Sequence, residues 1–581
     1  MSRLVLERAG YRLTLDPSGL RAVLESPAGE HWATLALVAA LDRVDATDET
    51  LAVAPPRVDG DTVVLERRST VWDRAGTTLL LGEDELKVRT WVEGRGALGE
   101  AHLLGGRSLL PDSATGFFPT GSSFRTLFTP APADPGQILL PATSATVLGA
   151  SGDGALGRGH WFSTPPPLFL ALTTGDPDDP EDEVAGGWLG LGLAAPVEEL
   201  SFVELAYRPG ERAFHLVLDY EGHTRVEGSF AAPALVLTPG LPDPYTGLRR
   251  HRDGLAARGA APEPVARETP SWWEEPMFCG WGAQCHLARS EGARAPALAT
   301  QERYDAFLGA LEAEDVVPGT IVIDDKWQDG YGTNRPDREK WPDLRGWIAR
   351  RHDRGQHVLL WWKAWDPEGL PPELCIRTPD GVPIAVDPTN PAARATVGAA
   401  IGEMLSPDGL DADGLKVDFT GRTPVGRALV THGPGWGIAL LHELLAVVYA
   451  AAKAAKPDAL VITHTPHPAF ADVSDMLRLN DMLRLDDPGA LPSVLPQMRY
   501  RTAVARAACP ELLVDTDDWC VPDKASWREF LELKPELGVP SLYYATHIDR
   551  TGEALDADDY EALRRTWARW RARAPREAVE A

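Results

Sequence analysis

Cysteine is scarce in this 581-residue chain, which contains five in all. Their number is odd, and they lack the paired spacing that marks a structural zinc site. We therefore expect reduced, mostly buried thiols, as in an intracellular protein, and no disulfide framework. The five residues are Cys279, Cys285, Cys375, Cys509 and Cys520.

The chain also lacks a clean apolar run of membrane-spanning length. Within residues 440–455, the polar side chains of His442, Glu443 and Lys453 interrupt the apolar pattern. The N-terminus reaches charged residues too early for the apolar core of a signal peptide. We therefore expect no membrane association and a cytoplasmic location, which would restrict the substrate to small, imported molecules.

Basic residues are few relative to acidic ones, 57 against 85, and the formal net charge is −28. A nucleic acid or an anionic membrane surface is therefore not expected as a partner, and solubility explains the charge. A homo-oligomer remains open. The hydrophobic content of 44% supports sizeable cores, and the length predicts two or three domains. The 19 tryptophans favour a carbohydrate ligand, because indole rings stack on sugar rings.

The first part of the chain, residues 1–240, has the pattern of an N-terminal β-sandwich domain. Residues 11–15 alternate between apolar and polar side chains and end at the turn signal Asp-Pro-Ser-Gly. Similar short strands are expected at 62–66, 85–92, 203–207 and 213–220. Residues 241–275 are predicted to be a proline-rich linker that contains one helix, at 244–258.

Residues 276–581 alternate strands with amphipathic helices, which predicts a catalytic (β/α)8 TIM barrel. A doubly wound open sheet is the alternative, but the first strand lacks the glycine-rich phosphate turn typical of that fold. The fold class is thus multidomain, an all-β sandwich followed by a barrel. The eight expected strands are residues 278–282, 320–325, 357–362, 414–419, 459–463, 476–480, 512–515 and 541–546.

In such barrels the catalytic groups lie at the carboxyl ends of the strands. The fourth strand delivers Lys416 and Asp418, which share one face because side chains alternate along a strand. A nearby cation keeps a carboxylate ionised, as a nucleophile requires. Salt-bridged strand ends are common, so this pair carries weight only with similar groups at neighbouring strands.

The second strand ends with Asp324 and Asp325, followed by Trp327. Adjacent acids point to opposite sides, so we expect one to face the barrel mouth and bind sugar hydroxyls while the other braces it. Calcium ligands or a helix cap are the alternative interpretation. Trp327 offers a stacking face. The third strand brings three tryptophans in five residues, and Trp362 is the expected substrate contact. The following Asp-Pro-Thr-Asn-Pro segment (387–391) is expected to be a structural helix cap.

These motifs together resemble the retaining α-galactosidase clan, glycoside hydrolase families 27 and 36, and most of all family 36. The shared motifs are Asp-Asp-x-Trp, the Leu-Trp-Trp strand, Asp-Pro-Thr-Asn-Pro and Leu-Lys-x-Asp, in this order. The resemblance implies that Asp418 is the nucleophile. It also implies that Asp324, Asp325 and Lys416 bind the sugar and that Asp481 is the acid/base. We expect His464 and Arg478 to line the substrate site.

The sequence departs from family 36 in segments that bear on substrate choice. His-Thr-Pro-His-Pro (464–468) replaces the usual Glu-x-Cys-Ser-Gly-Gly segment, and Arg-Leu-Asn-Asp (478–481) replaces Trp-x-Ser-Asp. Lys326 stands where many members have glycine. Asp486 and Asp487 are rival candidates for the acid/base role. The acidic cluster at 515–518 either lines the leaving-group side or caps the next helix.

The sequence thus predicts a retaining exo-α-glycosidase that acts on small oligosaccharides or glycosides by two-carboxylate chemistry. A transglycosylase of the same clan and a non-catalytic sugar-binding barrel are the alternatives. A metal-dependent barrel hydrolase or aldolase is a further alternative, because His464 and His467 have a spacing that can ligate a metal. We expect no metal and no cofactor.

Overall fold

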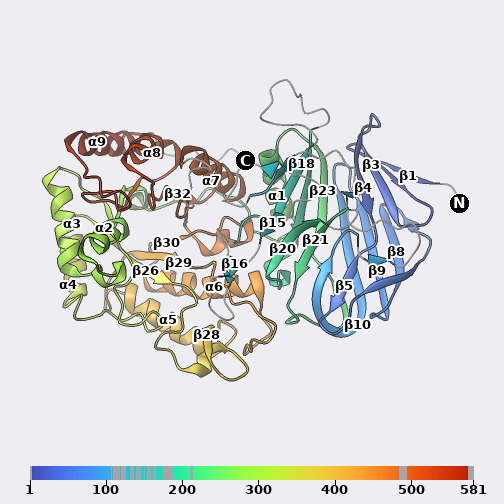
Figure 1. The fold of residues 1–581 in the computed structure, drawn as a ribbon, viewed down its shortest axis with the longest axis horizontal. Coiled ribbons are helices and arrows are strands. Elements are labelled where there is room, and N and C mark those ends of the chain that lie inside the picture. The colour runs from blue at the N-terminus through green and yellow to red at the C-terminus, as the bar shows by residue number, and fades with distance from the viewer. Residues whose placement is uncertain are drawn as a thin grey trace.

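The computed structural model describes residues 3–105, 165–173, 187–209, 213–482 and 494–573. It also describes short segments at 107–108, 118–119, 126–130, 137–138, 145–148, 151–152 and 159–160. Asp486 and Asp487 lie outside the described residues. Figure 1 shows an N-terminal β domain, blue to green, beside a barrel whose strands and helices run from green to red.

The N-terminal domain is all-β, as predicted, and begins with a four-stranded antiparallel sheet. Its second strand alternates half-buried and buried residues and ends in a turn, where the Asp16 carboxylate accepts a hydrogen bond from the Ser18 backbone at 2.9 Å. Gly19 follows with a positive φ of 73°. This sheet contains β1 (Leu4–Glu7), β2 (Arg12–Leu15), β3 (Arg21–Glu25) and β4 (His31–Ala36).

The rest of this domain differs from the expected sandwich in how its sheets are joined. Strand β10 (Leu86–His102) is 17 residues long and pairs with β9, β22 and β23 along most of its length and with β5 and β21 at its end. The strands therefore close into one hydrogen-bonded circuit. Other members of this circuit are β5 (Ala40–Arg43), β6 (Glu49–Val53), β7 (Arg57–Asp59), β8 (Thr62–Ser69), β9 (Arg74–Leu81), β18 (Phe169–Thr173), β19 (Trp188–Ala194), β20 (Glu204–Pro209), β21 (Ala213–Asp219), β22 (Arg225–Ala231) and β23 (Ala234–Leu241).

Shorter strands complete the domain: β11 (Arg107–Ser108), β12 (Phe118–Pro119), β13 (Thr126–Phe128), β14 (Gln137–Ile138), β15 (Ala145–Leu148), β16 (Ser151–Gly152) and β17 (Gly159–His160). The helix expected at 244–258 is α1 (Pro244–Ala257), with Asp243 as its N-cap. It packs against β18, β19 and β23. We propose that the domain boundary lies within 241–275, before the first barrel strand.

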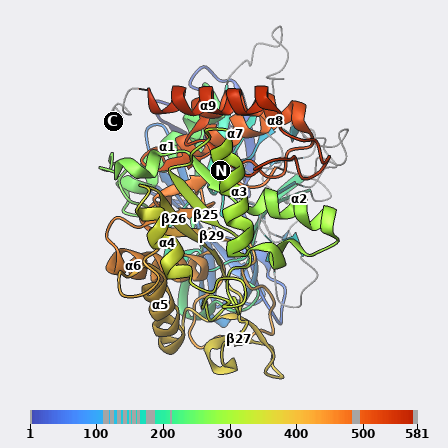
Figure 2. The same ribbon diagram turned by 90° about the vertical axis from the view of Figure 1, so that its left-hand side faces the viewer.

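All eight predicted barrel strands are present, in sequential order and parallel. The backbone of Val539, just before the last strand, forms hydrogen bonds with Val514 and Thr516 beside the seventh strand, so the barrel is nearly closed. Figure 2 shows β25, β26 and β29 side by side within the helical layer. The strands are β24 (Met277–Cys279), β25 (Thr320–Ile323), β26 (His357–Lys363), β29 (Gly414–Asp418), β30 (Leu460–Thr463), β31 (Met476–Arg478), β32 (Leu513–Asp515) and β33 (Ser541–Leu542).

Helices cover the barrel because each buries one apolar face. The Asp-Pro-Thr-Asn-Pro segment caps α5 as expected, since the Asn390 side chain accepts a hydrogen bond from the Ala392 backbone at 2.9 Å. A small hairpin, β27 (Cys375–Arg377) and β28 (Pro383–Val386), precedes that cap. The helices are α2 (Trp281–Glu291), α3 (Gln301–Ala313), α4 (Leu344–His352), α5 (Pro391–Leu405), α6 (Gly437–Ala455), α7 (Val494–Ala508), α8 (Lys524–Leu537) and α9 (Ala557–Arg571). The short 3-10 turns are η1 (Val197–Glu199), η2 (Ser271–Glu274), η3 (Ala295–Leu298), η4 (Pro372–Leu374) and η5 (Pro468–Val473).

Helix α6 is long and apolar enough to cross a membrane by length and composition alone. It belongs to the helical layer of the barrel, where it packs against α5, η5 and η1. A core helix of a globular domain passes the same test, so we assign α6 no membrane role.

The β domain contacts the loop that follows the fourth barrel strand. The Glu221 carboxylate accepts a hydrogen bond from the Gly426 backbone at 2.8 Å, and the ring of His223 stacks on Trp436 with centroids 3.5 Å apart. The β domain thus supports the loop directly after the expected nucleophile.

Candidate active site

Asp418 ends strand β29 and lies at the carboxyl end of the barrel. One of its oxygens, Oδ1, accepts hydrogen bonds from Arg478 Nη2 at 3.0 Å and from the Phe419 backbone at 2.8 Å. The other, Oδ2, accepts one from Trp361 Nε1 at 3.1 Å. Its side chain keeps 21% of its surface exposed, so the carboxylate is fixed and still accessible.

The electrostatic surroundings favour the ionised form of Asp418. Burial alone would raise the pKa of this carboxyl group, but the charges of Arg478 and Lys416, together with His464, hold it well below its usual range. Arg478 is the cation in direct contact with Asp418. The sequence pattern had indicated Lys416 for that role.

Lys416 forms its ion pair with Asp324 instead. Its Nζ lies 2.7 Å from Asp324 Oδ2, and both side chains are buried. Asp324 Oδ2 also accepts a hydrogen bond from the Cys279 thiol at 3.0 Å. The expectation that one acid of the pair braces the site fits Asp324, whose buried side chain leaves no face for a sugar.

Asp325 points to the other side and stays partly exposed. Its Oδ1 accepts a hydrogen bond from the Tyr331 hydroxyl at 2.7 Å. Burial and the negative charges of Asp324 and Asp418 raise its pKa to about 6, against the lowering effects of Tyr331 and Lys363. Asp325 is therefore the accessible acid of the pair, and its role in sugar binding stays a prediction.

Arg478, on β31, connects the two candidate catalytic carboxylates. Its Nη2 reaches Asp418 at 3.0 Å, and its Nη1 reaches Asp481 Oδ1 at 2.9 Å. The same Nη1 also contacts Asp517 Oδ2 at 2.6 Å. The side chain of Arg478 is 2% exposed, so this predicted substrate-site residue is a buried link between the two carboxylates.

Asp481 lies just beyond β31 and is the more exposed of the two carboxylates, with 43% of its side chain accessible. Arg501, on α7, donates to the backbone carbonyls of residues 479, 480 and 481 and so fixes this loop. Asn480 has a positive φ of 69°, which asparagine tolerates, and its side chain accepts a hydrogen bond from the Asp481 backbone at 2.9 Å.

The pKa of Asp481 is shifted in the opposite direction to that of Asp418. Desolvation by the surrounding protein is the largest effect and, with the negative charges of Asp517 and Asp418, raises this pKa to about 6, against the lowering effect of Arg478. Two carboxyl groups with pKa values shifted in opposite directions are the pattern expected of a nucleophile and a general acid.

Two expected tryptophan contacts need correction. Trp327 is fully buried, and its Nε1 donates to the backbone carbonyl of Trp361 at 2.8 Å, so it offers no stacking face. Trp362 is 3% exposed and lies in register with Val417. Trp361 lies opposite Lys416 on the neighbouring strand, and its Nε1 donates the hydrogen bond to Asp418.

The tryptophan of this strand that contacts Asp418 is therefore Trp361, one residue before the predicted Trp362. Residues paired in adjacent parallel strands point to the same side, so Trp361 and Lys363 share the face of Lys416 and Asp418. Matching the two strands by this parity would have selected Trp361. Tyr331 was missed as a site residue, because its position in a loop gives no comparable signal, and Asp517 was named only as part of the acidic cluster at 515–518.

The two histidines that follow the fifth barrel strand have different surroundings. His464 is buried, with Nδ1 3.2 Å from Arg478 Nη2. His467 is buried as well, and its Nδ1 accepts a hydrogen bond from the Ala469 backbone as the cap of η5. The arrangement supports a site role for His464 and a structural one for His467.

The acidic cluster after β32 is buried rather than lining the site. Asp515 accepts a hydrogen bond from Ser541, and Asp518 pairs with Lys534 at 2.7 Å. Asp517 reaches the site through Arg478. The five cysteines, all within the described residues, are free thiols.

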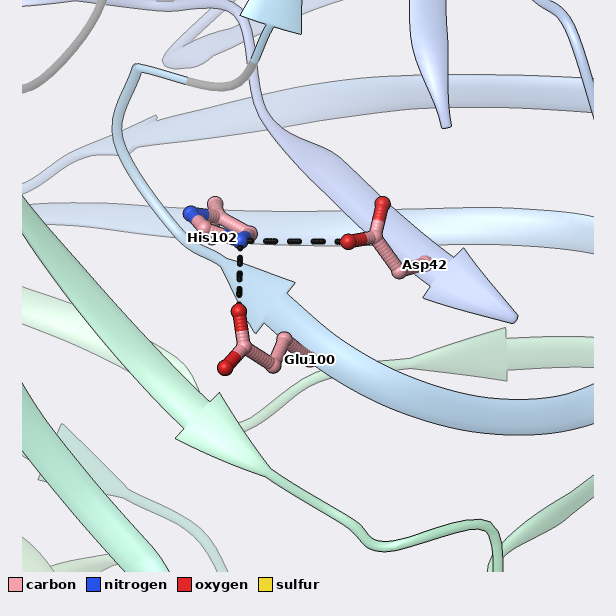
Figure 3. A group of neighbouring side chains, drawn as sticks. All are labelled: Asp42, Glu100 and His102. Atoms are coloured by element: carbon pink, nitrogen blue, oxygen red, sulfur yellow. Dashed lines mark ion pairs between the residues drawn. The ribbon is translucent and has the colours of Figure 1, made fainter. Parts of the chain in front are cut away.

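A group suited in geometry to a metal ion lies in the β domain. His102 Nε2 is 3.2 Å from Glu100 Oε2 and 4.0 Å from Asp42 Oδ2. Figure 3 shows both carboxylates directed at the histidine ring. Acidic groups of this kind are common without an ion, so we assign no metal site here.

Comparisons with known proteins agree with this architecture. No protein-family model and no curated protein sequence matches the chain. Among solved structures, a family 31 sulfoquinovosidase from E. rectale with an aza-sugar inhibitor matches 97% of this chain and 82% of its own, at 11% identity and a TM-score of 0.57. The α-galactosidase of Thermus thermophilus, solved with stachyose, matches 90% of this chain and 100% of its own, at 17% identity and a TM-score of 0.51.

An uncharacterized Listeria monocytogenes protein, solved with glucose, magnesium and calcium, also matches, at 11% identity and a TM-score of 0.54. The match covers 97% of this chain but 58% of the Listeria protein. The similar structures come from more than one glycosidase family, so they support the resemblance to families 27 and 36 in part. The chain shares with these structures the fold of an N-terminal β domain followed by a TIM barrel.

Proposed function

We propose that this protein is a retaining exo-α-glycosidase, most similar to the α-galactosidases, that hydrolyses small oligosaccharides or glycosides. The supporting observation is that Arg478 joins two accessible carboxylates, Asp418 and Asp481, whose pKa values are shifted in opposite directions. The similarity to an α-galactosidase solved with stachyose supports the substrate class.

In the first step, the Asp418 carboxylate attacks the anomeric carbon and forms a glycosyl ester. The bond from that carbon to the leaving oxygen breaks, and protonated Asp481 donates its proton to this oxygen. In the second step, water attacks the same carbon, Asp481 takes the proton of the water, and Asp418 leaves as a carboxylate. Arg478 and Trp361 hold Asp418 in position through both steps.

Sugar recognition is proposed for the groups that remain partly exposed at the mouth. Asp325 accepts hydrogen bonds from sugar hydroxyls, and Tyr331 fixes its orientation. Lys363 lies 3.8 Å from the centroid of the Tyr331 ring and forms an ion pair with Asp366. Lys416 and Asp324 support these groups from inside the barrel, where they form a buried ion pair.

Two alternatives follow from the same site. A transglycosylase would use the same first step and a sugar acceptor in place of water. A non-catalytic sugar-binding barrel is less consistent with the structure, because both carboxylates are accessible and held in place.

A panel of aryl α- and β-glycosides, assayed with wild type and Asp418→Ala, tests the proposal. We expect turnover of an α-glycoside, loss of essentially all of it in the variant, and an unchanged circular dichroism spectrum. Near-native turnover by Asp418→Ala would contradict the assignment of the nucleophile. Release of products in the presence of added sugars separates hydrolysis from transfer.

A further inference from the structure

We propose that Asp517 is a positioning residue that holds Arg478 between the two catalytic carboxylates and thereby keeps the proton on Asp481. This inference rests on the proposed function, in which Asp481 is the general acid. Asp517 belongs to the buried acidic cluster after β32 and has no contact of its own with the site opening, since its side chain is fully buried.

The carboxylate of Asp517 is fixed from two sides. Its Oδ1 accepts hydrogen bonds from the backbone of Asp518 at 2.6 Å and of Trp519 at 3.0 Å. Its Oδ2 accepts one from Arg478 Nη1 at 2.6 Å. Its backbone has a positive φ of 52°, a conformation that a non-glycine residue adopts at a cost. The local chain is thus built to direct one buried negative charge at Arg478.

Asp517 and Asp481 compete for the same nitrogen of Arg478. The contact with Asp517 is the shorter, 2.6 Å against 2.9 Å, and it is fully buried, whereas Asp481 is 43% exposed. A buried charge pair is screened less than an exposed one. Arg478 therefore divides its charge among Asp418, Asp481 and Asp517, and the buried contact with Asp517 fixes its position.

The charges around Asp481 show the direction in which Asp517 acts. The carboxylates of Asp517 and Asp418 both raise the pKa of Asp481, because each disfavours a further negative charge beside it. Arg478 and Lys416 lower this pKa, but Arg478 also contacts Asp418 and Asp517, and Lys416 is paired with Asp324. Among the described residues, the other groups around Asp481 are His464, which contacts Arg478, the Cys520 thiol, and the cation Arg501, which binds backbone carbonyls and interacts with both Asp481 and Asp517.

The substitution Asp517→Asn tests the proposal, because it removes the charge and keeps the shape. We expect the pKa that defines the high-pH limb of the kcat/KM profile to fall by about one unit. At pH 7, kcat should fall more for substrates with poor leaving groups than for aryl glycosides with activated phenols. Asp517→Glu restores the charge and should return the limb toward its wild-type position. Asp517→Ser is a second neutral variant if Asp517→Asn does not fold.

Asp413→Asn is the matched control. Asp413 is a buried carboxylate that pairs with His352 and Lys456 at the opposite end of β29, so its loss removes a comparable ion pair away from the site. We expect this variant to be destabilised with an unchanged high-pH limb. An unchanged limb in the neutral Asp517 variants, or an equal shift in Asp413→Asn, would overturn the proposal.

A spectroscopic titration separates this proposal from the proposed function. The infrared carboxylic C=O band that disappears in Asp481→Asn reports the protonation of Asp481 in the resting protein, without any substrate. We expect its midpoint to fall in Asp517→Asn and to stay in Asp413→Asn, even if no glycoside is ever turned over. A midpoint that does not move in Asp517→Asn refutes the role of Asp517, whatever the activity.

Discussion

The ammonium group of Lys416 lies 2.7 Å from Asp324, and neither side chain exposes more than 4% of its surface. Substituting Lys416 by Met leaves the Asp324 carboxylate buried without its cation. We expect a loss of about 3–5 kcal/mol of unfolding free energy, which urea denaturation measures. The double variant Lys416→Met, Asp324→Asn should recover part of this loss. Additive losses from the two single changes would show that the pair is not coupled.

Asp481→Ala should separate substrates by leaving group. We expect losses of about 10²–10⁴-fold in kcat for glycosides with sugar leaving groups, because these require a proton donor. Aryl glycosides with activated phenols should lose much less in the first step, since their leaving groups need no proton. Steady-state kinetics on both classes checks this. Equal losses on the two classes would count against the acid/base role.

The activity should decline as pH rises through about 6. The pKa of Asp481 is raised to about 6, so its acidic form is present below that pH and is lost above it. The pKa of Asp418 is lowered, so the nucleophile stays ionised below the usual titration range of aspartate, and the low-pH limb should lie under about pH 4. A kcat/KM profile measured over this range tests both limbs, and a flat profile above pH 6 would be inconsistent with Asp481 as the acid.

Trp361→Phe and Trp362→Phe form a matched pair on one strand. Trp361 donates to Asp418 at 3.1 Å, and Trp362 is buried in register with Val417. A hydrogen bond to a charged group contributes about 1.5–3 kcal/mol, so Trp361→Phe should lower kcat by about tenfold or more. Trp362→Phe should leave kcat close to wild type. The reverse result would restore the sequence-based choice of Trp362.

Chelators should not affect the activity. The two-carboxylate mechanism requires no metal, and the groups that meet at the site are an arginine, a lysine and acids that are already paired with them. Incubation with EDTA followed by assay on an aryl glycoside measures this. Loss of activity that returns with added metal would favour the metal-dependent alternative.

Much of the fold could be predicted because its signals are local. The helix faces of α3 and α9 follow the 3.6-residue period, and Tyr304, Leu311, Leu563 and Trp567 are buried as that period requires. The eight barrel strands stand out as short apolar runs, several of which end in acids or tryptophans. The closure of the β domain through β10 could not be predicted, since strand pairing between distant segments leaves no local pattern.

The sequence alone determined the order of the barrel strands and the pairing of Lys416 and Asp418 on one face, because side-chain alternation is a property of the strand itself. Only the tertiary structure decided which groups meet. Arg478, sixty residues from Asp418, reaches both that residue and Asp481, and Lys416 turns to Asp324. Barrel closure sets these distances, and the register between neighbouring strands decides that Trp361, rather than Trp362, faces the site.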